Sequence, residues 1–309
     1  MKIVNLKITD KIEQIEEGLV VALGFFDGIH LAHMDLINEV IKVGHEKSLK
    51  TGVVTFHPHP AFILNKSDIT TFLTPLEVKA EILAEIDLDY LFIVEFDRET
   101  ALLEHKQFIE TYLLPLNVHT VIAGYDNKYG LDGKGSVKTI DADSNGLITP
   151  ITIEEKTFNN QKIGSSLIRR MLETGDVHKV SELLGRNYTI DGFVTHGRGR
   201  GKTIGLPTAN LALNYPYKVP KSGVYVVKVQ LDERELYGIC NIGHNPTFNY
   251  NANMTIEVNI FDFDEDIYGD HLKIEFIERI RDEVKFAGID ELLSQIKLDK
   301  AKSRKIIGK

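Results

Sequence analysis

The sequence has one cysteine, no apolar run long enough to cross a bilayer and no excess of basic side chains. Because an intrachain disulfide needs two cysteines, Cys240 fits a reducing compartment and a place in the core. The longest apolar run, Leu19–Leu23 with two phenylalanines just beyond it, is far shorter than the ~20 residues that span a bilayer. The first ten residues carry charges where a signal peptide needs an apolar stretch. We therefore expect a cytoplasmic protein without a membrane partner.

The charge balance limits the class of ligand. The chain has 36 Lys and Arg against 45 Asp and Glu, a net charge of −9 at pH 7. Such a balance argues against broad electrostatic binding to nucleic acid or to an anionic membrane, and leaves a local pocket for a small anion. The 309 residues, 43% of them hydrophobic, suggest two domains at roughly 150 residues each. We expect small-molecule ligands, and the sequence identifies no protein partner.

Strand-like and helix-like segments alternate through the first half of the chain. Leu19–Leu23 has the continuous apolar character of a buried strand, residues 36–41 carry apolar side chains at helical spacing, and residues 51–56 return to a strand-like run. The alternation continues with helix-like segments over 75–86 and 108–114 and strand-like segments over 90–96 and 118–123. The pattern predicts a Rossmann-like parallel sheet covered by helices.

The pattern changes after about residue 187. Short alternating segments over 224–229, 254–261 and 271–276 are separated by turn residues, which predicts an antiparallel barrel or sandwich. An apolar stripe at helical spacing over 290–309 predicts a C-terminal helix. We therefore expect two domains, residues 1–186 and residues 187–309.

The turn after Leu23 has the features of a phosphate site. It contains Gly24 and Gly28 and leads into a helix that is expected to start near His33. The free N–H groups and the positive dipole end at the start of such a helix favour an anion. His30 and His33 would add hydrogen-bond donors toward a transferring phosphoryl group. Two histidines at this spacing are more often structural or exposed, so the surrounding residues must decide.

A second glycine-bearing segment, residues 205–211, also reads as a phosphate site. Thr208 and Asn210 are two residues apart, so in an extended segment they would face the same side, toward one Mg–ATP complex. The nearby Gly-Arg-Gly-Arg-Gly-Lys-Thr stretch is not a P-loop, because His196 stands where that motif needs glycine. Two alternatives stay open. Thr208 and Asn210 could be ordinary turn residues, and Glu257, a further candidate in the strand-like segment 254–261, could be an ordinary strand residue.

Residues 24–33 resemble the G-x-F-D-G-x-H-x-G-H form of the nucleotidylyltransferase signature. With segments 55–60, 73–79, 124–130 and 163–169, the first half resembles the bacterial bifunctional riboflavin kinase/FAD synthetases. It implies a nucleotidylyltransferase-like α/β domain that joins FMN to the AMP moiety of ATP, giving FAD. The residues it implies are the catalytic His30, His33 and Arg169, the ATP-binding Gly24, Asp27, Gly28, Ser165 and Ser166, and the flavin-binding Asp126 and Tyr129.

The second half resembles the same family's riboflavin kinase, with segments 192–202, 205–211, 223–225, 241–248, 255–258, 266–269 and 281–286 in the family's order. The resemblance implies a β-barrel that converts riboflavin and ATP to FMN and ADP with Mg²⁺ or another divalent cation. Thr208 and Asn210 would hold the metal and the ATP phosphates, and Glu257 would orient or deprotonate the ribityl 5′-hydroxyl. The remaining implied residues are Gly197, Lys202, Gly205 and Pro207 near ATP, and Asn241, Arg281 and Glu283 near the flavin.

The first domain departs from the family's pattern at its site. Ala32 replaces a glycine, Asn127 an aromatic residue and Leu167 an arginine, and Gly164 and Ser166 replace a serine and a threonine. Losing one oriented donor to the transition state can cost ~3 kcal/mol. The departures leave two alternatives to a bifunctional enzyme: a riboflavin kinase with an inactive first domain, and a flavin or nucleotide sensor that does not turn over.

Overall fold

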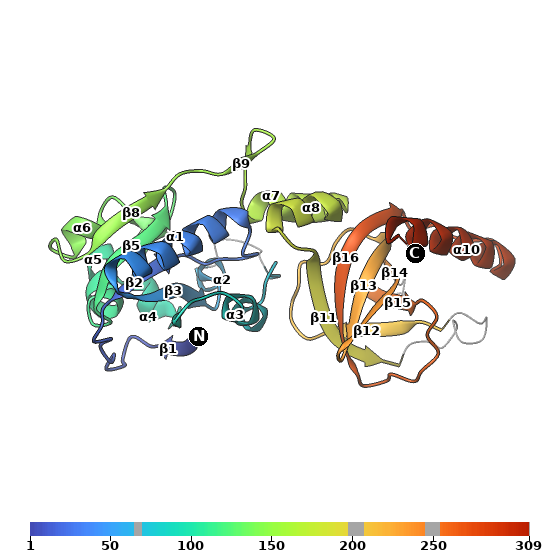
Figure 1. Ribbon diagram of the computed structural model, residues 1–309, viewed down its shortest axis with the longest axis horizontal. Coiled ribbons are helices and arrows are strands. Elements are labelled where there is room, and N and C mark those ends of the chain that lie inside the picture. Colours follow the sequence, from blue (N-terminus) through green and yellow to red (C-terminus); the bar gives the residue numbers. More distant parts are fainter. Residues whose placement is uncertain (65–69, 197–206, 245–253, 309) are drawn as a thin grey trace. The chain divides into compact units, whose positions relative to one another are not determined.

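The computed structural model of the protein describes residues 1–64, 70–196, 207–244 and 254–308. The chain divides into two compact units, Met1–Ser165 and Ser166–Lys309 (Figure 1). The boundary expected between residues 186 and 187 would instead assign two helices, α7 (Ser165–Thr174) and α8 (Val177–Leu184), to the first domain. Both divisions separate a sheet unit from a barrel unit, and the domain boundary itself stays a prediction.

The first unit is built on a six-stranded sheet in the order β1-β4-β3-β2-β5-β8. Every pairing in this sheet is parallel, which confirms the expected α/β class. The strands are β1 (Lys2–Leu6), β2 (Leu19–Leu23), β3 (Lys50–His57), β4 (Tyr90–Glu95), β5 (Val118–Gly124) and β8 (Thr149–Ile153).

Both faces of this sheet are covered. Along β2, Leu19, Val21 and Leu23 join one apolar cluster and Val20 and Ala22 join another, as the alternation of a strand requires. The α1 helix packs on the second of these faces, and the residues of η1 belong to the first cluster. The helices are α1 (Leu31–Lys47), α2 (Pro60–Ile63), α3 (Leu76–Ala84), α4 (Arg98–Leu102), α5 (His105–Phe108), the π-helical η1 (Ile109–Leu113), the 3₁₀ turn η2 (Leu131–Gly133) and α6 (Ile140–Asp143).

Two short antiparallel ribbons complete the first unit, β6 (Lys128–Tyr129) with β7 (Gly135–Ser136) and β9 (Thr157–Phe158) with β10 (Gln161–Lys162). The helix expected over 108–114 is in fact the π-helical segment η1, which continues directly from α5. Its buried Tyr112 hydroxyl lies 3.0 Å from the Thr100 hydroxyl, so this irregular segment is anchored inside the core.

The second unit is a closed antiparallel barrel in the order β11-β12-β15-β14-β13-β16, with β16 pairing back to β11. Because the sheet closes, the second unit is a barrel and not a sandwich. The expected C-terminal helix is present as α10 (Ile289–Ile306), which packs against β14 and β16 (Figure 1). Cys240 is completely buried, as expected. The strands are β11 (Tyr188–Thr195), β12 (Ala209–Leu213), β13 (Gly223–Leu231), β14 (Arg234–His244), β15 (Met254–Ile260) and β16 (His271–Arg281).

Candidate functional sites

The turn between β2 and α1 holds an unusual backbone. Gly28 has φ +94°, and the two non-glycine residues Phe26 and Ile29 also lie in the left-handed region, at +56° and +40°. Both of their side chains are buried, so packing compensates for the strain. Strained conformations of this kind persist where the surroundings over-determine them, and they concentrate at functional sites.

The two histidines of the turn come together at the start of α1. His30 is the N-cap, and its Nδ1 accepts a hydrogen bond of 3.3 Å from the backbone N–H of His33. The two rings stack with centroids 3.6 Å apart, and the Phe26 ring meets His33 edge-on at 5.1 Å. The first turn of α1 carries no acidic side chain, so the positive end of the helix dipole remains available to an anion.

The other expected residues of this turn make hydrogen bonds within the unit. The Asp27 carboxylate accepts hydrogen bonds from the backbone N–H groups of Leu73 and Thr74, at 2.9 and 3.1 Å. The Ser165 hydroxyl donates to the Asp27 carbonyl at 2.8 Å, and the N–H of Gly24 donates to Val54 at 3.1 Å. The Asp27 carboxylate therefore holds a neighbouring backbone segment, and phosphate contacts by these residues stay predictions.

Lys79 was not singled out from the sequence, although it ends one of the resembling segments. Its ammonium donates to the Phe25 carbonyl at 2.5 Å and to the Thr55 hydroxyl at 3.0 Å, and the side chain is almost fully buried. Burial lowers the pKa of Lys79 to about 8, against the opposing effect of the Asp27 charge. Lysine on a helix normally faces solvent, so sequence pattern gave no signal for this contact.

The two residues expected to contact flavin in the first unit lie in different environments. The Tyr129 hydroxyl donates to Asp143 at 2.8 Å and its ring lies 5.5 Å from that of Phe108, in the core. Burial raises the pKa of Tyr129. Asp126 instead forms an ion pair with Lys162 at the surface. Tyr129 is thus part of the internal packing, and a flavin contact by either residue stays a prediction.

The residues that depart from the family's pattern differ in burial and in hydrogen bonding. The Asn127 amide donates to the carbonyl of Leu23 at 3.1 Å, where β2 ends, so it supports the start of the turn. Leu167 is buried on α7, where an arginine would need a partner. A Cβ added at Gly164 would meet nothing within 4 Å. Ser166 and Arg169 lie on α7 in the second unit, and their roles stay predictions.

In the barrel, four of the expected residues lie in one row across neighbouring strands. Asn210 of β12 pairs with Glu257 of β15, and Glu257 pairs with Asn241 of β14. Asn241 pairs in turn with Val224 of β13, which pairs with Arg281 of β16. Directly opposite residues of antiparallel strands share a face with Cβ atoms about 5 Å apart. The fold therefore assembles one polar row from residues up to 71 positions apart, from 210 to 281.

Glu257, Asn241, Val224 and Arg281 of this row line a cavity beneath the C-terminal helix, which we call the α10 cavity, whereas Asn210 lines a neighbouring pocket described below. The α10 cavity has a volume of about 340 Å³, and aliphatic side chains from the barrel and from α10 alternate there with polar ones. A cavity that combines apolar side chains with convergent polar groups suits a small organic ligand that has both kinds of surface. The lining residues are Thr208, Val224, Ile239, Asn241, Glu257, Asn259, Arg281, Glu283, Val284, Phe286, Leu292, Ile296 and Asp299.

The charge of Glu283 acts on a second carboxylate of the α10 cavity, that of Glu257. Burial, together with the nearby charge of Glu283, raises the pKa of Glu257. Glu283 lies over Gly243, where an added Cβ would come within 2.5 Å of the Glu283 Oε1 atom. A raised pKa makes the Glu257 carboxylate a stronger base than a solvent-exposed glutamate.

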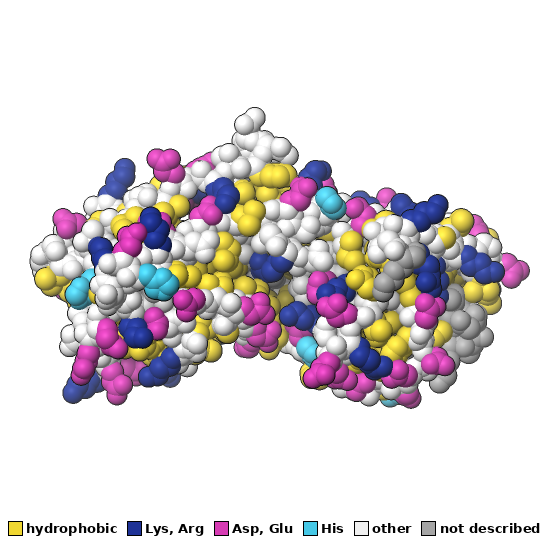
Figure 2. Space-filling model, viewed as in Figure 1, with side chains coloured by type: hydrophobic (Ala, Val, Ile, Leu, Met, Phe, Trp, Pro, Cys, Tyr) yellow, Lys and Arg dark blue, Asp and Glu magenta, His cyan; other side chains and the backbone are white. Residues whose placement is uncertain are grey.

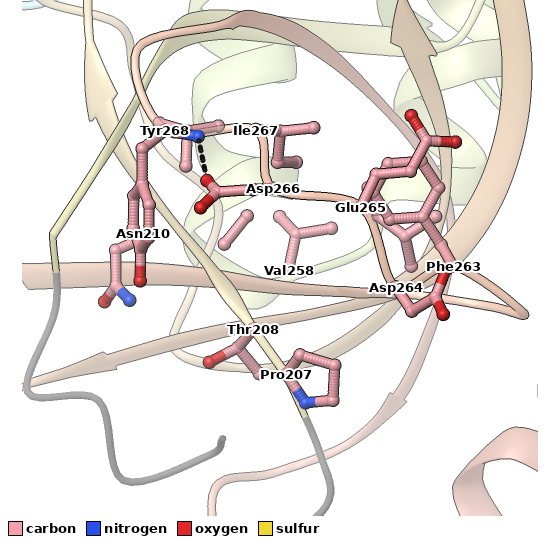
Figure 3. Close-up of a pocket in the computed structure, with 13 residues that line it drawn as sticks. Pro207, Thr208, Asn210, Val258, Phe263, Asp264, Glu265, Asp266, Ile267 and Tyr268 are labelled. Carbon is pink, nitrogen blue, oxygen red and sulfur yellow. Dashed lines mark hydrogen bonds between the residues drawn. The ribbon is translucent and has the colours of Figure 1, made fainter.

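A second pocket lies beside strand β12, and we call it the β12 pocket. It has a volume of about 140 Å³ and lies between the Pro207–Thr208 segment and loop 263–268, as Figure 3 shows. The Tyr268 N–H donates to Asp266 at 3.2 Å and helps to fix that loop. Thr208 lines both the β12 pocket and the α10 cavity, so it stands where ligands of the two spaces would meet.

Asn259 is a further polar residue of this region that sequence reasoning missed. Its amide donates to the Pro207 carbonyl at 2.7 Å, and its Oδ1 is buried with no hydrogen-bond partner among the residues that the structure describes. The opposite amide orientation would set two oxygens against each other, so the Pro207 carbonyl fixes the assignment. Asn259 lies two residues after Glu257 on β15, and residues two apart on a strand face the same side. This spacing was the sequence signal that could have identified Asn259. Three expected ATP-binding residues, Gly197, Lys202 and Gly205, lie outside the described residues.

The surface that Figure 2 shows carries acidic and basic side chains interspersed over both units. Within the described residues, no helix is both long and apolar enough to span a membrane. Neither observation identifies a ligand, so the ligands are inferred from the two candidate sites.

Comparisons with known proteins cover nearly the whole chain. Residues 12–167 match the family described as FAD synthetase, and residues 184–307 match the family described as riboflavin kinase. Proteins named bifunctional riboflavin kinase/FMN adenylyltransferase are 44% identical in Bacillus subtilis, over 94% of this chain and 92% of that protein, and 34% identical in Escherichia coli, over 95% and 94%.

A solved structure from Streptococcus pneumoniae has a similar fold. It is described as a macrolide-efflux protein and aligns with a TM-score of 0.89 and 31% identity, over 97% of this chain and 99% of that one. Its description names a different activity from that of the sequence relatives.

Proposed function

The chain belongs to the family of bifunctional riboflavin kinases/FMN adenylyltransferases, and from this premise we propose how its residues phosphorylate riboflavin and adenylylate FMN to FAD. The observation that carries the assignment of residues is the row formed by Asn210, Glu257, Asn241 and Arg281 across the barrel. It is consistent with one polar site for a flavin and ATP.

In the kinase, riboflavin occupies the α10 cavity with its ring against the aliphatic side chains and its ribityl chain directed toward Glu257. ATP lies in the β12 pocket, with its γ-phosphate near Thr208, the residue common to both spaces. The 5′-hydroxyl oxygen attacks the γ-phosphorus while the bond to the bridging oxygen of ADP breaks, and the hydroxyl proton passes to the Glu257 carboxylate. The products are FMN and ADP.

ATP enters this reaction as its Mg²⁺ complex. The hydroxyl of Thr208 and the amide oxygen of Asn210 are the oxygen donors that Mg²⁺ accepts in proteins. Within the described residues, no three or more His, Cys, Asp and Glu side chains are grouped so as to hold a metal. Thr208 and Asn210 would hold this cation together with the phosphate oxygens, and the cation would offset the charge on the transferring phosphoryl group.

In the first unit, the turn between β2 and α1 binds the triphosphate of a second ATP. A phosphate oxygen of FMN attacks the α-phosphorus, pyrophosphate leaves and FAD forms. The backbone N–H groups at the start of α1, with His30 and His33, stabilise the charge that develops on the transferring group. Arg169 is assigned to the same reaction by resemblance to the family.

The first unit's role is the point on which the alternatives differ. A kinase with an inactive first unit would form FMN but no FAD. A flavin sensor without turnover would form neither, and the proposed bifunctional enzyme would form both. Asn127 favours the proposal, since its amide supports the turn through the Leu23 carbonyl. We also propose a cytoplasmic location, because the lone Cys240 suits a reducing compartment.

The test is to incubate the purified chain with riboflavin, ATP and Mg²⁺ and to separate the flavins by chromatography. The proposal expects FMN to appear first and then FAD. FMN without FAD would leave only the kinase, and neither product would favour the sensor. Supplying FMN instead of riboflavin measures the second reaction alone.

A further inference from the structure

Lys79 lies beneath the turn that leads into α1. It belongs to α3, its side chain is 2% exposed, and its ammonium donates to the Phe25 carbonyl and to the Thr55 hydroxyl at 2.5 and 3.0 Å. The Phe25 ring lies 4.4 Å from the same ammonium. Burying an ammonium group is costly unless its partners compensate for the lost water, so this placement calls for a reason.

The Phe25 carbonyl is an effective point for controlling the turn. It belongs to the peptide group shared with Phe26, the first residue of the turn with a left-handed backbone, at φ +56°. The Thr55 hydroxyl also donates to this carbonyl, at 2.9 Å. Two donors, one of them charged, thus fix one peptide group at the point where the chain enters its strained conformation.

A second contact joins the same two segments with the opposite charge. Asp27, on the turn, accepts from the backbone N–H groups of Leu73 and Thr74, just before α3 begins. Lys79, on α3, donates back to Phe25. The turn and the segment 73–79 are therefore linked by a carboxylate from one side and an ammonium from the other.

We propose that Lys79 is a positioning residue of the adenylyl-transfer site, which acts by holding the Phe25 carbonyl and, through it, the phosphate-binding turn from Gly24 to His30. This inference rests on the proposed function of the first unit. Lys79 acts through the backbone of the turn, by its hydrogen bond to the Phe25 carbonyl. Its effect is on the placement of the N–H groups and histidines that face the transferring phosphate, and a displacement of about 1 Å there can cost ~100-fold in rate.

The experiment replaces Lys79 with methionine, which keeps the unbranched chain but removes the charge and the donors. Lys79→Met is expected to lower kcat for FAD formation from FMN and ATP by about 100-fold. Its melting temperature should not fall, because the variant no longer buries a charge. A role in stability alone would instead lower the melting temperature along with the rate.

Thr55→Val supplies a second variant, which keeps the Lys79 side chain but removes the hydroxyl that accepts a hydrogen bond from it. It removes one of the two donors to the Phe25 carbonyl while keeping the side-chain volume, so we expect a smaller loss of kcat in the same direction. Lys47→Met is the matched control, since Lys47 also donates to a threonine, Thr120, at 3.4 Å, but from α1 to β5. Its FAD formation should stay within about twofold of the wild type, and FMN formation should be unchanged in every variant.

The outcomes are separable. A wild type that forms FAD, with Lys79→Met and Thr55→Val both at wild-type kcat, would overturn the inference and leave the proposed function intact. The inference would also be overturned if Lys79→Met unfolded while Thr55→Val remained folded and fully active. A wild type that forms no FAD would overturn the proposed function of the first unit and this inference with it.

Discussion

Arg281 of β16 is held by Asp299 of α10, with hydrogen bonds to one carboxylate oxygen of 3.0 Å from Nε and 2.8 Å from an Nη atom. The Asp299 side chain is 3% exposed and that of Arg281 is 20% exposed. Gln295 donates to the other oxygen of Asp299 at 2.9 Å. A residue expected beside the flavin therefore also fastens the C-terminal helix over the α10 cavity.

Asp299→Asn is expected to destabilise the barrel unit by about 2 to 3 kcal/mol, because it leaves a largely buried guanidinium without its counter-charge. The riboflavin KM should rise as the α10 cavity loosens. Chemical denaturation and kinase kinetics measure the two effects. Asp262→Asn is the control, since its ion pair with Arg304 is exposed and should contribute less than about 1 kcal/mol. Equal effects of the two substitutions would contradict this account.

Glu257→Gln should lower the kinase kcat by about 100-fold with little change in riboflavin binding. The amide keeps the size of the side chain but does not accept the proton of the ribityl hydroxyl in the transition state. Steady-state kinetics, with riboflavin affinity measured by quenching of flavin fluorescence, separate the two quantities. Turnover close to that of the wild type would remove Glu257 from the role of base.

Glu283→Gln should move the acid limb of the kinase pH profile to lower pH. Glu257 acts as a base only when ionised, so the rate falls as the pH drops through its raised pKa. Burial and the Glu283 charge both raise that pKa. Removing the charge leaves burial in place, so the limb should shift downward but remain above that of an ordinary glutamate. An acid limb that stays in place would show that Glu283 has no electrostatic effect on catalysis.

Leu167→Arg restores the residue type that the family's pattern has on α7, yet we expect it to destabilise the protein. The Leu167 side chain is 5% exposed, so the substitution would bury a guanidinium without a partner, at a cost of about 3 kcal/mol or more. Thermal melting checks the stability, and FAD formation from FMN checks the activity. A stable variant with faster FAD formation would show that α7 can turn this side chain outward.

The elements of the fold followed largely from local pattern. Continuous apolar runs marked the buried strands β2, β3, β4 and β5, and alternation marked β13, β15 and β16. The pairing of β12, β15, β14, β13 and β16 into one barrel wall was not visible, because register depends on contacts between distant segments. The residues of the barrel row were therefore named from resemblance, and only their pairing shows how they come together.

Side-chain partners were the least predictable feature. Tyr129 and Asp27 are predicted to contact ligands, which stays untested, but the sequence gave no sign that their polar groups also bond to Asp143 and to the backbone of residues 73–74. Lys79 and Asp299 gave no sequence signal at all, since lysine and aspartate on helices are normally solvated. Such roles depend on which neighbour faces each residue after packing.

Alternate residues of strand β15 face two different pockets. Glu257 and Asn259 line the α10 cavity, whereas Val258 and Ile260 line the β12 pocket. One inserted residue between Met254 and Glu257 would shift the strand by a single step, turning Val258 toward the α10 cavity and Glu257 toward the β12 pocket. A one-residue insertion in this strand would therefore remove Glu257 from the proposed kinase site even if the barrel still closed.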